Sequence, residues 1–129
     1  MLSVQSQDLS KHHWEERLIL LLTEDVDNEN FKSQMLELES GAKALEDRKV
    51  LVYQVSKHKM KLGFSENAKW TAATNLYKKY DENGSPFEFY LIGLDGKVKL
   101  QDTNCVSIDK ILDLIDTMPM RKNEMRSKN

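Results

Sequence analysis

Two stretches of the chain are apolar enough to form strands at the centre of a sheet. Residues 18–22 are an unbroken aliphatic run, which is typical of a strand covered on both faces. Residues 86–100 are rich in aromatic and aliphatic side chains up to Ile92, and then alternate Val98 and Leu100 with lysine. Within residues 86–100, Asp95-Gly96 separates the two apolar halves and predicts a two-residue hairpin turn, which requires positive φ angles. We expect the other elements to be arranged around this hairpin.

A helix is predicted between the first strand and the next apolar run, because apolar side chains recur there at steps of four and three residues. Asp27 or Asn28 can cap its start. Residues 50–55 predict a second strand, and the helical crossover makes it parallel to the first. The apolar positions of the helix are Phe31, Met35, Leu38, Ala42 and Leu45.

The segments on either side of the hairpin have different patterns. Residues 56–67 show little periodicity and predict a surface loop, whereas the spacing of apolar and aromatic side chains over residues 70–80 predicts a helix. After the hairpin, Ser107 can cap a last helix whose apolar stripe runs from Ile108 to Met118. Pro119 should end or kink that helix.

The resulting order of strand, helix, strand, helix, hairpin and helix predicts an α/β fold of the thioredoxin-like type, with a mixed sheet and helices on both faces. We expect the sheet order to be second hairpin strand, first hairpin strand, strand one and strand two. Residues 1–11 are polar and predict a flexible arm, and residues 12–129 predict a single domain.

Composition excludes several classes of protein. A chain of 129 residues with 40% hydrophobic content has the size of one domain, and a net charge of −2 gives no reason to expect nucleic acid as a partner. Cys105 is the sole cysteine, so an intrachain disulfide, a CxxC pair and a cysteine-rich zinc site are excluded. No apolar run is long enough for a transmembrane segment, and residues 1–7 could be the remnant of a trimmed signal peptide.

Two parts of the chain resemble a known family. The hairpin over residues 91–100 and the segment over residues 115–125 look like the signature of a bacterial family, domain of unknown function 4174, and Trp14, Arg17 and Gln34 also fit its pattern. Related domains occur in vertebrate secreted matrix proteins, among them the sushi-repeat-containing proteins. The resemblance implies a thioredoxin-like, peroxiredoxin-related fold, a periplasmic or secreted location and no established activity.

The resemblance also implies where a nucleophile would be. Thioredoxin-type enzymes carry it after the first strand, where residues 23–29 of this chain contain no cysteine. No lysine, arginine or histidine adjoins Cys105 to lower its pKa, so a partly buried apolar residue is the simplest interpretation. An atypical thiol oxidoreductase or peroxidase-like enzyme that uses Cys105 is the alternative.

Two further groups of residues contain side chains of the kinds that bind metal ions. The carboxylates of residues 24–29 match no calcium loop, and His12, His13 and His58 have no partner at a metal-site spacing. Helix capping and solvation explain the carboxylates, and a solvated arm explains His12 and His13. We therefore assign no catalytic, cofactor-binding or metal-binding residue.

The C-terminal segment is the strongest candidate for a specific role. In one interpretation the tail folds back, the methionines cover the end of the core, and Arg121 pairs with an acidic neighbour. In the other, the methionine and arginine side chains form a docking patch, and both can hold together. We therefore predict a non-catalytic binding or interaction module with a protein or peptide partner. The candidate interaction residues are Trp14, Arg17, Asp116, Met118, Pro119, Met120, Arg121 and Glu124.

Overall fold

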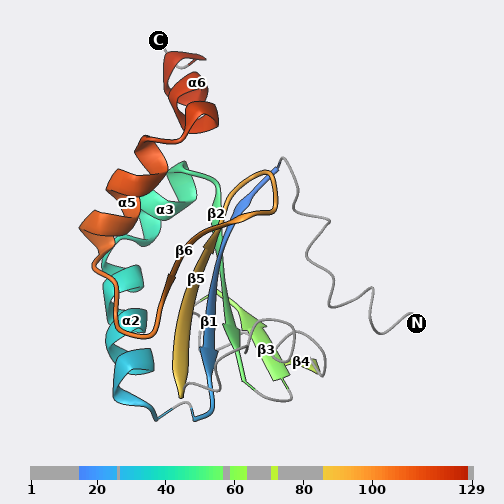
Figure 1. Ribbon diagram of the computed structural model, residues 1–129, viewed down its shortest axis with the longest axis vertical. Coiled ribbons are helices and arrows are strands. Elements are labelled where there is room, and N and C mark those ends of the chain that lie inside the picture. Colours follow the sequence, from blue (N-terminus) through green and yellow to red (C-terminus); the bar gives the residue numbers. More distant parts are fainter. Residues whose placement is uncertain (1–14, 26, 57–58, 64–70, 73–85, 128–129) are drawn as a thin grey trace.

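The structure is a computed structural model, and it describes residues 15–25, 27–56, 59–63, 71–72 and 86–127 (Figure 1). The predicted N-terminal arm, Trp14, the three histidines and most of the helix predicted over residues 70–80 lie outside the described residues. The elements are β1 (Arg17–Thr23), α2 (Glu29–Ser40), α3 (Ala42–Asp47), β2 (Val50–Val55), β3 (Lys59–Leu62), β4 (Thr71–Ala72), β5 (Phe87–Ile92), β6 (Val98–Asp102), α5 (Ile108–Asp116) and α6 (Pro119–Ser127).

The described strands form one mixed sheet in the order β4-β3-β2-β1-β5-β6. Strand β1 runs parallel to β2 and antiparallel to β5, and β5 forms a hairpin with β6. The predicted order of the four strands β6-β5-β1-β2 is therefore confirmed. Helices α2, α3 and α5 lie on one side of this sheet, and α6 continues beyond the end at which β1 begins (Figure 1).

Strand β1 is buried along its whole length, which explains its unbroken apolar run. Successive side chains of a strand point to opposite faces. Ile19 and Leu21 therefore join the core under the helices, whereas Leu18, Leu20 and Leu22 join a second buried cluster on the opposite face. The helices contribute Phe31, Leu38, Leu45, Ile111 and Ile115 to the first core.

Two predictions between β2 and β5 are wrong. The predicted loop over residues 56–67 contains β3, which pairs antiparallel with β2. Met60 is the only buried residue of this four-residue strand, so its apolar alternation is too short to be recognised. The helix predicted from residue 70 is also contradicted at Thr71 and Ala72, which form β4 and pair with β3.

The single helix predicted over residues 31–45 is divided into α2 and α3 at Gly41. A Cβ atom at Gly41 would lie 2.5 Å from Cγ1 of Ile108, so the absence of a side chain at this position lets the start of α5 come close. The predicted cap is confirmed at Asn28, whose Oδ1 accepts a hydrogen bond from the Phe31 N–H at 3.0 Å. Gln34 then joins α2 to the segment before α5 by two hydrogen bonds with the Val106 backbone, of 2.8 and 2.7 Å.

The hairpin turn differs from the two-residue turn that we predicted. The Gly96 N–H donates to the Gly93 carbonyl at 3.0 Å, the Gly93 N–H donates to the Lys97 carbonyl at 2.9 Å, and φ is +79° at Gly96. The loop is thus three residues long, with a glycine in the left-handed region at its last position. The pairing shifts by one residue between Leu91 and Ile92, which leaves Lys99 as an additional residue in β6.

Helix α5 is capped by Ser107 as predicted, through a 3.2 Å hydrogen bond from the Lys110 N–H. Helix α5 ends at Asp116, and the tail is the separate helix α6, which begins at Pro119. Proline suits the first turn of a helix because its missing N–H has no partner there. The corner between α5 and α6 lies at the same end of the molecule as the β5–β6 loop (Figure 1).

Candidate functional site

Three arginines and three acidic residues form an ion-pair network at this end of the sheet. Arg17 is the first residue of β1, Arg48 lies between α3 and β2, and Arg121 lies in the first turn of α6. Arg17 and Arg121 are buried, with 1% and 4% of their surface exposed. Their acidic partners are Asp47, Asp116 and Glu124.

Asp116 is the best-paired carboxylate of the network. Arg48 binds it with two hydrogen bonds, from Nε at 2.9 Å and from Nη2 at 2.8 Å, and Nε of Arg121 donates a third at 3.2 Å. These bonds, that from Arg48 first, hold the pKa of Asp116 below its ordinary value although partial burial opposes this. The end of α5 is thereby tied to the link between α3 and β2.

Arg121 ties α6 to the same place. Its Nη2 donates to Asp47 Oδ2 at 3.1 Å, and its Nη1 lies 3.4 Å from both the Asp47 carbonyl and Glu124 Oε1. Burial disfavours the charge of Arg121, but the hydrogen bonds to Asp116, Glu124 and Asp47 outweigh it and raise the pKa of the guanidinium. Arg121 therefore stays charged although it is buried.

Arg17 has a less complete set of partners. Its Nη1 donates to the Arg48 carbonyl at 2.7 Å and to Glu124 Oε1 at 3.3 Å. Its Nη2 lies 3.2 Å from Glu124 Oε2, but neither Nη2 nor Nε makes a hydrogen bond among the described residues. A buried cation thus has one short hydrogen bond and two long contacts.

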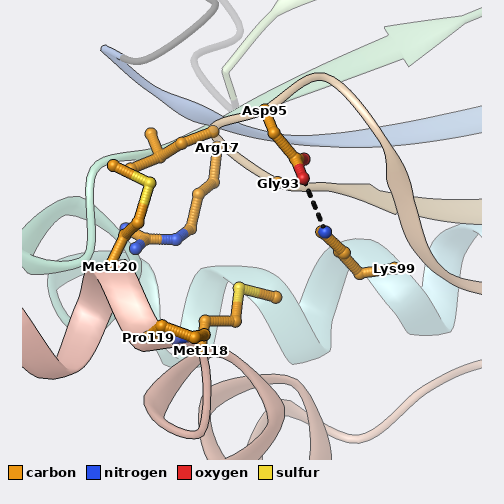
Figure 2. A pocket seen from close by; sticks show the side chains of 8 residues that line it. Arg17, Gly93, Asp95, Lys99, Met118, Pro119 and Met120 are labelled. Carbon is orange, nitrogen blue, oxygen red and sulfur yellow. Dashed lines mark hydrogen bonds and ion pairs between the residues drawn. The ribbon is translucent and has the colours of Figure 1, made fainter.

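A pocket of about 340 Å³ opens beside the network. The hairpin loop contributes residues 93–95 and Lys99, the α5–α6 corner contributes residues 118–120, and Arg17 comes from β1. Figure 2 shows Arg17 on one side of the pocket and the Asp95–Lys99 ion pair on the other, with Met118 and Pro119 beneath. Most of the lining is apolar, and the charged groups lie at two opposite sides.

The hairpin loop is fixed by Asp95. Its Oδ1 accepts a hydrogen bond from the Lys97 N–H at 3.0 Å and its Oδ2 binds Lys99 Nζ at 2.9 Å. These two bonds, the backbone one first, lower the pKa of Asp95. Gly93 leaves room for the lysine, since a Cβ there would lie 2.6 Å from Lys99 Cε.

The structure brings most of the predicted candidate residues to this one end of the molecule. Arg17, Asp116, Arg121 and Glu124 belong to the network, whereas residues 118–120 line the pocket; Trp14 is outside the described residues. Met118 packs against the core, but Met120 is 40% exposed and does not cover it.

Sequence reasoning missed six residues of the site. Arg48 and Asp47 carry no periodic signal, and they meet partners far away in sequence. The other four, Gly93, Leu94, Asp95 and Lys99, belong to the predicted hairpin, but the hairpin pattern does not show that they line a pocket.

The usual place for a thiol, after β1, holds no redox group. Thr23 is buried and its hydroxyl donates to the Asp25 carbonyl at 2.5 Å, while the Glu24 N–H donates to the Pro86 carbonyl at 3.0 Å. Cys105 is exposed, contrary to the prediction of partial burial, because Val106 takes the inward position. Partial desolvation and the nearby Glu37 raise the pKa of the Cys105 thiol.

Two further observations concern the described residues only. The described residues include no histidine, and their cysteine, aspartate and glutamate side chains form no group of three or more that could hold a metal ion. None of the helices in this part of the chain is both long enough and apolar enough to cross a membrane.

Comparisons with known proteins agree with the fold. A family model described as Domain of unknown function (DUF4174) matches residues 8–124. A search of curated protein sequences gave no match.

Among solved structures, the reduced 2-Cys peroxiredoxin of Plasmodium vivax is 16% identical with a TM-score of 0.61, over 89% of this chain and 84% of that one. The mitochondrial 2-Cys peroxiredoxin of Plasmodium falciparum is 16% identical with a TM-score of 0.56, over 85% and 79%. The AhpC protein of Mycobacterium tuberculosis is 8% identical with a TM-score of 0.53, over 90% and 75%. These likenesses show a thioredoxin-like fold.

Proposed function

This chain belongs to the DUF4174 family of domains of unknown function, and we propose that it is a non-catalytic thioredoxin-like binding module whose site is the pocket between the hairpin loop and the α5–α6 corner. The observation that carries the proposal is that this pocket is built from three segments distant in sequence and lies beside an ion-pair network with two buried arginines. Apolar pockets with a few fixed polar groups are typical binding sites.

The pocket has a rigid polar part and a flexible apolar part, and both are useful for binding a ligand. Hydrogen bonds hold Asp95 and Lys99 on one side, and Asp116 holds the α5–α6 corner through two arginines. Met118 and Met120 form the adaptable part, because methionine is flexible and polarisable and fits ligands of different shape. A protein or peptide segment that inserts an apolar side chain is the partner that this combination supports. The near-neutral charge of the chain gives no support to nucleic acid.

The alternative function is thiol chemistry at Cys105. The raised pKa of that thiol leaves little thiolate near neutral pH, and thiolate is the form that attacks peroxides and disulfides. Peroxide consumption and insulin reduction should therefore be the same for the wild type and Cys105→Ser. Turnover that disappears in Cys105→Ser would establish the alternative function.

We also propose that the protein is located outside the cytoplasm. This location is proposed because the chain resembles exported domains. Fractionation of cells that produce the natural gene product tests it. We expect the protein in the periplasmic or secreted fraction, and recovery in the cytoplasmic fraction alone would contradict this part.

Selection from a displayed peptide library tests the binding site itself. We compare the wild type with Met120→Glu, which places a charge at the mouth of the pocket, and with Leu36→Glu as the matched control. Leu36 is 68% exposed on α2 and does not line the pocket. Both variants should keep the thermal midpoint of the wild type because both positions are exposed.

We expect the wild type and Leu36→Glu to retain the same peptides and Met120→Glu to lose them. Equal retention by Met120→Glu would place the binding site elsewhere. Failure of the wild type to retain any peptide would count against a peptide-binding module.

A further inference from the structure

Arg17 differs from the other two arginines of the network in how well its charge is compensated. Arg48 meets Asp116 at 2.8 and 2.9 Å, which is the range expected of charge-assisted hydrogen bonds. Arg17 meets Glu124 only at 3.2 and 3.3 Å, although 1% of its side chain is exposed compared with 16% for Arg48. Buried charges normally complete their hydrogen bonds. Arg17 departs from this rule, because it is the most buried of the three arginines and the least completely paired.

The two unsatisfied nitrogens lie on the same edge of the guanidinium. Glu124 approaches the end of the group, with its two oxygens near Nη1 and Nη2, and Nη1 also donates to the Arg48 carbonyl. Nε and one N–H of Nη2 point in parallel along the remaining edge, where the structure shows no acceptor among the described residues. Such a pair of N–H groups is the fork that binds the two oxygens of a carboxylate.

This edge is next to the pocket but is covered. Arg17 lines the pocket, yet its Nε and Nη2 atoms are buried, so a ligand oxygen reaches them only if a side chain moves. Figure 2 shows the guanidinium and the Met120 side chain on the same side of the pocket. Met120 is 40% exposed and has three rotatable bonds, so its displacement costs little packing.

We propose that the pocket takes a carboxylate attached to an apolar group, with the carboxylate on the Nε–Nη2 edge of Arg17 and the apolar group against Met118 and Leu94. This inference rests on the proposed function and adds the chemical class of the ligand. A volume of about 340 Å³ corresponds to roughly ten water volumes. A short aliphatic acid or the C-terminal residue of a peptide fits that size.

The charge balance of the network argues against a dianion as the ligand. Three arginines face three carboxylates, and Lys99 is paired with Asp95, so there is no excess of positive charge to attract a phosphate dianion. The gain on binding comes from completing the hydrogen bonds of a buried arginine. Because buried ion pairs are weakly screened, binding should change little with salt concentration.

Calorimetric titration of the full chain tests the inference with matched pairs of ligands. One pair is hexanoate and hexanamide, and the other is a tripeptide ending in leucine with a free or an amidated C-terminus. We expect each carboxylate to bind at least about tenfold more tightly than its amide, as the loss of a hydrogen-bonded charge requires. The two pairs separate the sources of the carboxylate: a small acid alone, or a peptide C-terminus.

Arg17→Lys keeps the charge but removes the fork, and it should weaken carboxylate binding by at least about tenfold. Leu36→Ala is the matched control, because Leu36 is 68% exposed on α2 and does not line the pocket, so it should leave carboxylate binding unchanged. Since Arg17→Lys can fail to fold, a second measurement uses the wild type: the nitrogen resonance of Arg17 Nε should shift when hexanoate is added and not when hexanamide is added.

Equal binding of acid and amide, or an Arg17 Nε resonance that does not respond, would overturn the inference. If displayed peptides still require the pocket while no carboxylate is preferred, the ligand class is wrong and the proposed function stands. If neither peptides nor carboxylates bind at the pocket, both the ligand class and the proposed function are wrong.

Discussion

Replacing Asp116 by asparagine removes the charge at the centre of the ion-pair network while keeping the shape of the side chain. Asp116 accepts three hydrogen bonds from two guanidiniums, at 2.8, 2.9 and 3.2 Å. Each hydrogen bond to a charged group is worth about 1.5–3 kcal/mol when buried, but Asp116 is 32% exposed and its bonds are partly screened. We therefore expect Asp116→Asn to lower the free energy of unfolding by about 2 kcal/mol at pH 7.

The pH dependence of this effect has a definite sign. Folding lowers the pKa of Asp116, so in acid the unfolded chain binds more protons than the folded protein does. The stabilisation is complete above the unfolded pKa of about 3.9 and is lost as the pH falls through the lower pKa of the folded state. The difference between the wild type and Asp116→Asn should therefore shrink between pH 5 and pH 2, which are about one to two units on either side of that value.

Urea unfolding at several pH values measures this, with Asp113→Asn as the control. Asp113 is exposed on the same helix, so the same chemical change should alter stability by no more than about 0.5 kcal/mol. If Asp116→Asn costs no more than Asp113→Asn at pH 7, the network does not hold the α5–α6 corner. A large difference that persists unchanged in acid would refute the electrostatic explanation.

Three further changes test other parts of the structure by urea unfolding. Removal of α6 leaves the buried Arg17 without a carboxylate, so it should cost about 3 kcal/mol or more, and an unchanged midpoint would show that α6 is only an appendage. Gly96→Val should cost more than about 1 kcal/mol and Gly96→Asn less, because φ is +79° there; equal costs would contradict that conformation. Gln34→Leu leaves the buried N–H and carbonyl of Val106 unpaired and should cost about 2 kcal/mol, whereas a neutral result would mean that those bonds are not formed.

The elements with a strong and uninterrupted apolar pattern could be predicted from the sequence. Strand β1 is buried on both faces, so its run of aliphatic residues has one simple interpretation. Helix α5 has a regular apolar stripe, and its residues Ile111 and Ile115 are buried in the core. Strand β3 could not be predicted, because only Met60 faces a core and the strand depends on its pairing with β2.

The site was only partly predictable, for a different reason. Arg17 and Glu124 are 107 positions apart, and Arg48 and Asp116 are 68 apart, so no local pattern pairs them. The resemblance to a family pointed to residues at both ends of the chain, but the partners contributed by the α3–β2 link required the structure. The turn sequence Gly93-Leu94-Asp95-Gly96 is compatible with a two-residue or a three-residue loop, and the strand register decides between them.

The methionine methyl groups report directly on the claim that the pocket is the binding site. The chain has six methionines, of which Met118 and Met120 line the pocket, whereas Met35 packs against the core and Met60 lies in β3. A methyl NMR titration with a peptide selected from the displayed library should shift the resonances of Met118 and Met120 and leave those of Met35 and Met60 in place. Shifts at Met35 or Met60 with none at Met118 and Met120 would contradict the claim.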